Sequence, residues 1–377
     1  MWDARRTCIP LLWNLSPRLS SYFRVVEKKS LMGIRDPLFD RLENIEGYRQ
    51  AFTDGRAWRP YVRQVCQRHG LRPASKIRCG VPGSFPTFIV DERWVVKFFG
   101  RLFQGALDYR VELEASRLLS PYALPVPAIL AEGNLFEGLN GWNWPYLVFE
   151  FVPGVSIGEV YEQVSFDDKL RLAGWMGGLT RRLHQVPLAG STIFQPAWDE
   201  FFDLLRTQRA ACQAVFQAGH TGHAGPPMPP HLVDQIDRVL LPAELLVEDS
   251  AAPHLIHADL TADHILGRLQ NGQWHSAALI DFGDAMTGSL YYELVALHLD
   301  LFRCDKRLLR AYLDAYELGE ASRRQLPAKA MSLTLLHRFN TNCMEGVFRH
   351  DPQTLKLATL EEMADRIWDI NTPGLEE

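Results

Sequence analysis

Two carboxylates and an imidazole lie within one short part of the chain. Asp259 and His264 are separated by four residues, and apolar residues lead into and out of this loop. Asn271-Gly272 then predicts a tight hairpin turn, and the apolar run that follows it ends at Asp281. Because a hairpin would bring Asp281 back beside the loop, we expect these three side chains to meet at one point.

This set of groups suits phosphoryl transfer. One carboxylate can orient an acceptor hydroxyl and take its proton, while a second carboxylate can hold Mg²⁺ on the phosphates of a nucleotide. Mg²⁺ prefers oxygen ligands and keeps several waters, so few protein ligands are enough. Capping of a turn is the alternative for Asp259 or His264 taken singly, but their spacing, the strand context and Asp281 together favour a functional site.

Residues 257–264 read His-Ala-Asp-Leu-Thr-Ala-Asp-His, and residues 280–284 read Ile-Asp-Phe-Gly-Asp. This pattern resembles the aminoglycoside phosphotransferase and choline-kinase-like family of small-molecule kinases. Most of that family has Asn where this chain has His264, but the 2″-aminoglycoside kinases have His there. The resemblance implies that Asp259 is the catalytic base and that His264 and Asp281 are Mg²⁺ ligands. Imidazole is a softer ligand than an amide oxygen, so His264 could instead hydrogen-bond a metal-bound water.

An upstream lysine is the candidate phosphate ligand. Residues 76–90 read as a strand, a glycine-containing turn and a strand, and residues 94–99 read as a third strand that contains Lys97. A lysine among Trp, Val and Phe is unusual unless it is paired. At the turn, Gly83 and Ser84 would let backbone N–H groups approach phosphates. An ordinary hairpin is the alternative, because the turn is neither a GxGxxG nor a Walker motif.

In kinase-like folds, such a lysine contacts the α- and β-phosphates and pairs with a helix glutamate. Residues 109–119 predict that helix, with Glu112 or Glu114 as the partner of Lys97. Only one of them can point inward, because residues i and i+2 lie on different helix faces. The interval to the Pro-Val-Pro segment of the resembled family favours Glu112.

The segment 145–154 resembles the hinge of the same family. Backbone groups of Glu150 to Val152 would contact the edge of the nucleotide base, so side-chain identity leaves both ATP and GTP open as donors. Further along the chain, we expect Glu293 to anchor its segment to the catalytic loop and His184 to be a structural residue of the core. Residues 333–348 read as one apolar helix whose polar members could reach the acceptor.

Composition limits the class of protein. The chain has 377 residues, of which 47% are hydrophobic and 23% are charged, which suits a globular protein of two lobes. A net charge of −5 shows no excess of basic residues of the kind that indicates nucleic-acid binding. No apolar run approaches the roughly 18 residues that would span a membrane. Six scattered cysteines form no CxxC pair, and they read as ordinary thiols of a cytoplasmic protein.

We therefore predict an α+β, two-lobed protein-kinase-like fold, with a small antiparallel sheet in the N-lobe and a larger, mainly helical C-lobe. Residues 37–153 would form the nucleotide-binding N-lobe, and residues 154–377 the catalytic and acceptor-binding C-lobe. Residues 1–36 form a basic extension. A targeting peptide is the alternative, but the apolar run is short and contains Pro10, so we favour an extension of little consequence, with Met32 as a plausible start.

The predicted activity is transfer of the γ-phosphoryl group of ATP or GTP, with Mg²⁺, to a hydroxyl of a small molecule such as an aminoglycoside. The expected partners are the nucleotide and this acceptor, without nucleic acid or membrane. The alternative is a nucleotide-binding pseudokinase or scaffold, which His264 in place of Asn motivates. A protein kinase is disfavoured, because the His-Arg-Asp and Ala-Pro-Glu signatures are missing from the sequence.

Overall fold

The computed structural model describes residues 37–42, 45–72, 74–80, 83–136, 142–218, 226–247 and 252–371. They form two compact units. The first comprises the residues up to Arg117 together with Pro125–Pro153 and Ile280–Gly283, and the second comprises Leu118–Leu124, Gly154–Leu279 and the residues from Asp284 onward. The predicted extension, residues 1–36, lies outside the described residues. The assignment of nucleotide and acceptor binding to the two lobes stays a prediction.

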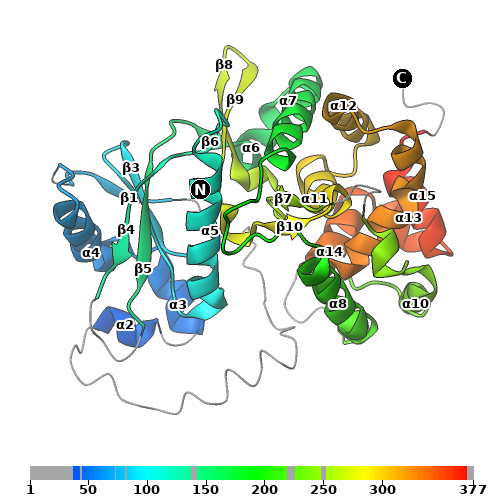
Figure 1. The fold of residues 1–377 in the computed structure, drawn as a ribbon, viewed down its shortest axis with the longest axis horizontal. Coiled ribbons are helices and arrows are strands. Elements are labelled where there is room, and N and C mark those ends of the chain that lie inside the picture. The colour runs from blue at the N-terminus through cyan, green and yellow to red at the C-terminus, as the bar shows by residue number, and fades with distance from the viewer. Residues whose placement is uncertain are drawn as a thin grey trace. The chain divides into compact units, whose positions relative to one another are not determined.

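The first unit is built on a five-stranded antiparallel sheet of order β1-β2-β3-β5-β4 (Figure 1). This sheet confirms the strands expected between residues 76 and 99. In the register of the central strand, Lys97 lies opposite Thr87 on one side and Leu147 on the other. The strands are β1 (Ile77–Cys79), β2 (Thr87–Val90), β3 (Trp94–Phe98), β4 (Ile129–Asn134) and β5 (Pro145–Glu150).

Helices cover both faces of this sheet. On one face lie α2 (Pro37–Arg41), α3 (Ile45–Phe52) and α4 (Gly55–Arg68), and the fully buried Trp58 of α4 stacks on Phe98 with ring centroids 4.8 Å apart. On the other face lies α5 (Gly105–Leu119), which packs against Leu147. Since side chains alternate along a strand, Lys97 points to the face that α5 covers.

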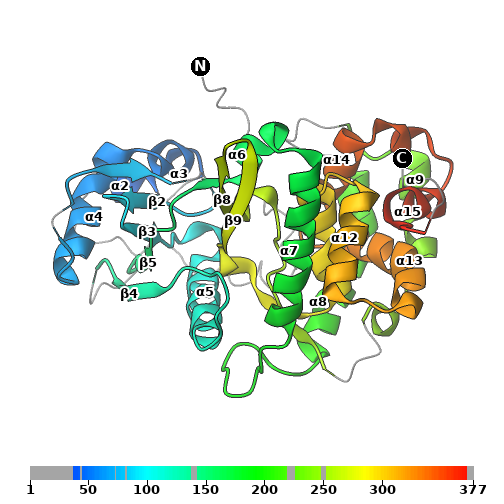
Figure 2. The same cartoon turned by 90° about the horizontal axis from the view of Figure 1, so that it is seen from above.

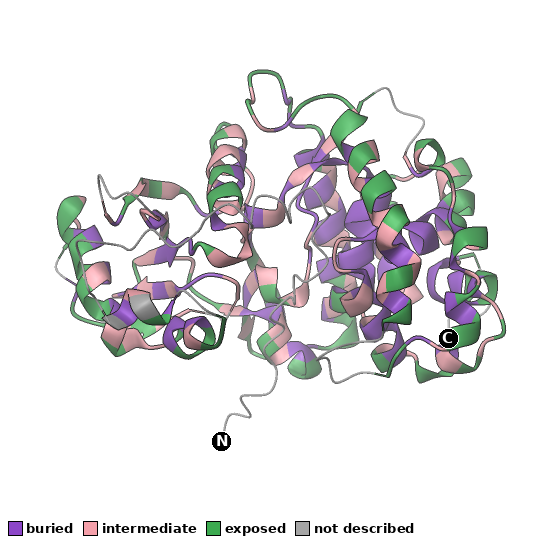
Figure 3. Ribbon diagram, turned by 90° about the horizontal axis from the view of Figure 1, so that it is seen from below, coloured by how far each residue is buried: buried purple, intermediate pink, exposed green. Residues whose placement is uncertain are grey.

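The second unit is mainly helical. Helices α7 (Phe166–His184) and α12 (Lys306–Tyr316) lie side by side (Figure 2), and Gly177 allows their close approach, because a Cβ there would lie 2.2 Å from the carbonyl oxygen of Tyr312. All seven residues of α11 (Leu290–Ala296) are buried within this unit (Figure 3). The other helices are α6 (Ile157–Val160), α8 (Asp199–Gln217), α9 (Pro230–Val233), α10 (Ile236–Val239), α13 (Glu320–Leu336), α14 (Asn340–His350) and α15 (Leu360–Trp368).

Two small antiparallel sheets belong to the second unit, and one of them contains the predicted hairpin. β8 and β9 pair up to Gln270 opposite Gln273, and the turn residues Asn271 and Gly272 have φ values of 51° and 78°. Two left-handed residues are what a type I′ turn requires, so the Asn-Gly prediction is confirmed. The strands are β6 (Val155–Ser156), β8 (Ile265–Gln270) and β9 (Gln273–Leu279) in one sheet, and β7 (His254–Ile256) and β10 (Met286–Gly288) in the other.

The single apolar helix expected over residues 333–348 is wrong. Helix α13 ends at Leu336 and α14 begins at Asn340. Between them, His337 is extended and its ring stacks on Tyr292 with centroids 4.4 Å apart, while the N–H of Arg338 donates to the Tyr292 hydroxyl at 3.1 Å. These contacts replace helical hydrogen bonds and therefore stabilise the break. Among the described residues, no helix is both long and apolar enough to cross a membrane.

Candidate active site

Lys97 lies between two carboxylates of the first unit. Its Nζ is 2.7 Å from Oε2 of Glu112 and 2.8 Å from Oδ1 of Asp281. The side chains of Lys97 and Glu112 are 9% and 5% exposed, and that of Asp281 is 39% exposed. Burial alone would lower the pKa of Lys97, but the carboxylates of Asp281 and Glu112 raise it above its ordinary value. The ammonium is thus held charged, and Glu112 is the partner that the sequence favoured.

Two aromatic rings flank the same ammonium. Nζ of Lys97 lies 5.3 Å from the ring centroid of Phe99 and 5.8 Å from that of Phe85, and the two rings pack on each other with centroids 5.0 Å apart. Ring faces attract cations and exclude water. The position of Lys97 is therefore set by packing as well as by charge.

The predicted glycine turn is anchored at Ser84. The hydroxyl of the buried Tyr48 in α3 donates to the carbonyl oxygen of Ser84 at 2.9 Å. A Cβ added at Gly83 would meet no atom within 4 Å, so this position is open. The neighbouring residues 81 and 82 lie outside the described part of the chain. A role of Gly83 and Ser84 in phosphate binding stays a prediction.

The predicted hinge continues from β5. The N–H of Glu150 donates to the carbonyl oxygen of Ala128 at 3.0 Å, and the N–H of Phe151 donates to that of Arg93 at 2.9 Å. The backbone N–H of Glu150 is thus used by the sheet. The N–H of Phe151 is used in the same way, so among the N–H groups of the predicted segment that of Val152 is left for base binding, which stays a prediction.

In the second unit, the loop that carries Asp259 is held through its backbone. Glu293 is fully buried, and its carboxylate accepts the N–H of His257 at 2.9 Å and the N–H of Ala258 at 2.7 Å. This confirms Glu293 as the anchor of the loop. Nε2 of His184 lies 4.0 Å from Glu293, and Nδ1 of His184 contacts the Tyr316 hydroxyl at 2.8 Å, as expected for a buried structural histidine.

The backbone is left-handed at Asp281 and at the residue before Asp259. Ala258, which precedes Asp259, has a φ of 63°, and Asp281 has a φ of 67°. Residues other than glycine rarely adopt this left-handed conformation, and such strain concentrates at functional sites. The bond from the Ala258 N–H to Glu293 helps to stabilise the strained conformation at the first of these positions.

His264 lies against the same loop. Its Nδ1 is 2.6 Å from the backbone carbonyl oxygen of Asp259 and 3.7 Å from Oδ2 of that residue. Because a carbonyl oxygen only accepts, Nδ1 carries the proton in the neutral ring, and the lone pair is on Nε2. A backbone carbonyl on one ring nitrogen orients an imidazole whose other nitrogen binds a metal.

The carboxylate of Asp281 is a ligand type that fits Mg²⁺, which commonly takes only one or two carboxylates beside water and phosphates. Ligation of Mg²⁺ by Asp281 and His264 stays a prediction, with a hydrogen bond from His264 to a metal-bound water as the alternative. Asp281 belongs to the first unit and His264 to the second. Among the described residues, no group of three or more His, Cys, Asp and Glu side chains could hold a metal by itself.

Two residues that hold the segments next to Asp259 and Asp281 in the chain were not predicted from the sequence. Asp300 accepts the N–H of Ala262 at 2.7 Å and so fixes the 3₁₀ turn Ala262–His264 that ends the loop. Arg338 pairs with Asp284 at 2.5 Å. Asp300 could have been found, because it is the one acid in the mainly apolar segment 297–301. Arg338 gave no such signal, because the sequence predicted an apolar helix over its segment.

Comparison with known families decides the assignment of the chain. Residues 80–326 match the family described as the phosphotransferase enzyme family. The chain belongs to this family. Its membership confirms the expected resemblance and the expectation of a phosphotransferase of the small-molecule kinase type.

Solved structures of known kinases share the fold of this family member. A GDP complex of aminoglycoside 2′-phosphotransferase-IIIa has a TM-score of 0.57 and 19% identity, over 81% of this chain and 97% of the other. A streptomycin–ATP complex of APH(2″)-IIa has a TM-score of 0.53 and 17% identity, over 80% of this chain and 98% of the other. A microcompartment-associated aminopropanol kinase has a TM-score of 0.52 and 16% identity, over 82% of this chain and 99% of the other. These similarities confirm the kinase-like α+β fold.

A curated relative from Arabidopsis thaliana, the lysine-specific demethylase JMJ21, is 24% identical over 217 residues. The match covers 48% of this chain and 22% of that relative, so the chain spans about a fifth of its length. The similarity therefore concerns one part of a much longer protein.

Proposed function

We propose that this phosphotransferase is a kinase that moves the γ-phosphoryl group of ATP or GTP to a hydroxyl of a small molecule. The observation that carries the proposal is the buried Lys97 ammonium between the carboxylates of Glu112 and Asp281. A buried cation held by two acids beside a glycine-containing turn is the arrangement that kinase-like folds use for nucleotide phosphates.

The donor would be bound by the first unit. Lys97 binds phosphate oxygens, and the backbone at Gly83 and Ser84 approaches them. The carbonyl oxygen of Glu150 and the N–H of Val152 contact the edge of the base. Relatives of the same fold were solved with GDP or with ATP, which supports a nucleoside triphosphate without choosing between the two.

Asp259 would act on the acceptor. The acceptor oxygen attacks the γ-phosphorus, the bond from that phosphorus to the β-phosphate oxygen breaks, and the nucleoside diphosphate leaves. The carboxylate of Asp259 orients the hydroxyl and receives its proton. Holding the loop rigid through Glu293 keeps Asp259 in position, and such positioning accounts for much of catalysis in phosphoryl transfer.

Asp281 and Nε2 of His264 would hold Mg²⁺, which when bound neutralises charge on the phosphates. For the acceptor, we propose a small molecule with hydroxyl and amino groups, such as an aminoglycoside or an amino alcohol. The proposal rests on the family membership and on the aminoglycoside and aminopropanol kinases that share the fold.

Replacing Asp259 by alanine tests the proposal. Asp259→Ala should lower kcat by about a thousandfold and leave nucleotide affinity unchanged, because it removes the base and no nucleotide ligand. Nucleoside diphosphate release and a nucleotide thermal shift measure the two effects. Asp263→Asn, in the same loop, is the matched control and should keep turnover. Tight nucleotide binding by the wild type without transfer to any acceptor would instead favour the scaffold.

A further inference from the structure

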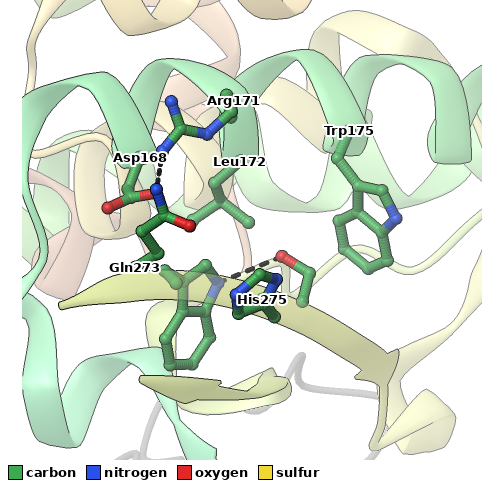
Figure 4. A pocket seen from close by; sticks show the side chains of 8 residues that line it. Asp168, Arg171, Leu172, Trp175, Gln273 and His275 are labelled. Atoms are coloured by element: carbon green, nitrogen blue, oxygen red, sulfur yellow. Dashed lines mark hydrogen bonds and ion pairs between the residues drawn. The ribbon is translucent and has the colours of Figure 1, made fainter. Parts of the chain in front are cut away.

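A cavity of about 450 Å³ lies in the second unit between α7 and the strand β9 (Figure 4). Its lining does not include Asp259, His264 or any other residue assigned above to catalysis, nucleotide or metal. The volume falls within the range of roughly 300–1,000 Å³ that small-ligand sites occupy. The cavity is thus large enough for a small molecule, and the proposed function leaves it unused.

Part of the α7 wall is apolar. Trp175 is half-buried, and Figure 4 shows its indole reaching from the helix toward the strand that carries His275. Leu172, one turn earlier on α7, is buried beside it. An exposed indole face next to a buried aliphatic side chain offers a surface on which a planar ring can stack.

The floor of the cavity is formed by β9. Trp274 of β9 is 6% exposed, and its Nε1 donates to the hydroxyl oxygen of Ser276 at 3.0 Å. Because that oxygen accepts from Trp274, the hydrogen of the Ser276 hydroxyl can be donated elsewhere. The floor therefore presents a preformed donor rather than a collapsible loop.

Each exposed polar side chain of the lining can donate a hydrogen bond. The side chain of Arg171 is 60% exposed, and Gln273 and His275 are exposed. The one acid, Asp168, is 2% exposed, and its carboxylate already accepts from the Ser165 hydroxyl at 2.7 Å and from Arg171. The ion pair with Asp168 engages one N–H-bearing nitrogen of Arg171, and the exposed remainder of its planar fork can donate to a ligand carboxylate.

We propose that this cavity binds a small aromatic carboxylate. Its ring packs against Trp175 and Leu172, and its carboxylate faces Arg171 and His275. None of its lining residues is assigned above to the nucleotide, the metal or the base, so its occupation does not depend on the proposed kinase activity.

Calorimetric titration of the full chain with indole-3-carboxylate, at saturating Mg-ADP, tests the proposal. The carboxylate should bind saturably, and the neutral indole-3-carboxamide at least about tenfold more weakly, since it loses the charge-assisted bonds to Arg171. Arg171→Gln and Trp175→Ala should each weaken binding of the acid by about tenfold or more. Arg181→Gln, which lies on α7 outside the cavity, is the matched control and should bind as the wild type does.

Three results would overturn the site: no saturable binding at millimolar acid, equal affinity for acid and amide, or binding that both cavity variants retain. Melting curves show whether each variant is folded. If one of them is not, the other variant and the acid–amide pair still decide the outcome.

Discussion

In the first unit, Lys97 is fixed by charge, because two carboxylates lie within 2.8 Å of its ammonium. In the second unit, the loop of Asp259 is fixed through its backbone, because two of its N–H groups donate to the buried carboxylate of Glu293. The first arrangement holds a side-chain cation in place, whereas the second holds a strained chain conformation. Under the proposed function, the cation for the phosphates is held by opposite charges, and the base for the acceptor hydroxyl is held through the backbone of its loop.

The two units differ in how acid should affect their stability, because the pKa of Lys97 is raised and the pKa values of buried histidines are lowered. The pKa of Lys97 is raised by its partners, so acid does not change its charge. Around the loop of the second unit, burial lowers the pKa of His254 to about 4 and that of His337 to about 3. These imidazoles are therefore neutral in the folded protein, and acidification should destabilise the second unit before it affects Lys97.

Lys97→Met should give the largest loss of stability. It removes the proposed phosphate ligand and leaves the buried Glu112 without its cation, so we expect turnover to fall by about a hundredfold and stability by about 3 kcal/mol. Nucleoside diphosphate release and urea unfolding measure these losses. The double variant Lys97→Met/Glu112→Gln should regain part of the stability and none of the turnover. Recovery of turnover in the double variant would contradict the role of Lys97.

Glu293→Gln should cost about 2 kcal/mol of stability, because the amide offers one acceptor oxygen for two buried N–H groups and turns a donor toward them. With the loop loosened, kcat should fall about tenfold while the KM for nucleotide stays the same. Glu317→Gln, an exposed change of the same charge in the same unit, is the control. A raised nucleotide KM with normal kcat would show that Glu293 does not act through the catalytic loop.

One histidine of the second unit, His298, can be used to measure the acid sensitivity of stability. His298 is buried, and its burial lowers its pKa to about 4. The unfolded imidazole has a pKa of about 6.5, so below that pH the unfolded chain binds a proton that the folded chain does not. Stability is fully present above the unfolded pKa and falls as the pH is lowered toward the folded value.

From about pH 7 to about pH 5, His298 should account for a loss of about 2 kcal/mol. His298→Asn should reduce the pH dependence of the unfolding free energy by this amount, as urea titrations at both pH values would show. An unchanged pH dependence would mean that His298 is charged in the folded state.

The smallest effect is expected at an exposed ion pair of the first unit. Arg117 lies 2.9 Å from Glu132, with side chains 59% and 42% exposed. Arg117→Gln should change the free energy of unfolding by less than about 1 kcal/mol, because water screens such pairs. Thermal melting measures this value. A loss as large as that of Lys97→Met would remove the distinction between buried and exposed pairs.

Local patterns predicted most of what lies near the candidate groups. Asn271-Gly272 predicted the hairpin, and the apolar strand around Lys97 with a helix glutamate at the right interval predicted the pair with Glu112. Asp300 was not predicted, because its contact with Ala262 joins residues 38 positions apart.

The same limit explains the helix expected over residues 333–348. The break is favoured by contacts with Tyr292 from α11, whose ring packs against His337 and whose hydroxyl accepts the N–H of Arg338. Periodicity in sequence reports which face is buried but not which distant ring lies on it.

The central claim is tested most directly by nucleoside diphosphate release, with ATP and GTP supplied separately with Mg²⁺, across aminoglycosides, amino alcohols and sugars. The account predicts release that depends on an acceptor and that falls about a thousandfold in Asp259→Ala. Acceptor-dependent release that Asp259→Ala retains would contradict the assigned base, and tight nucleotide binding without release for any acceptor would contradict the kinase.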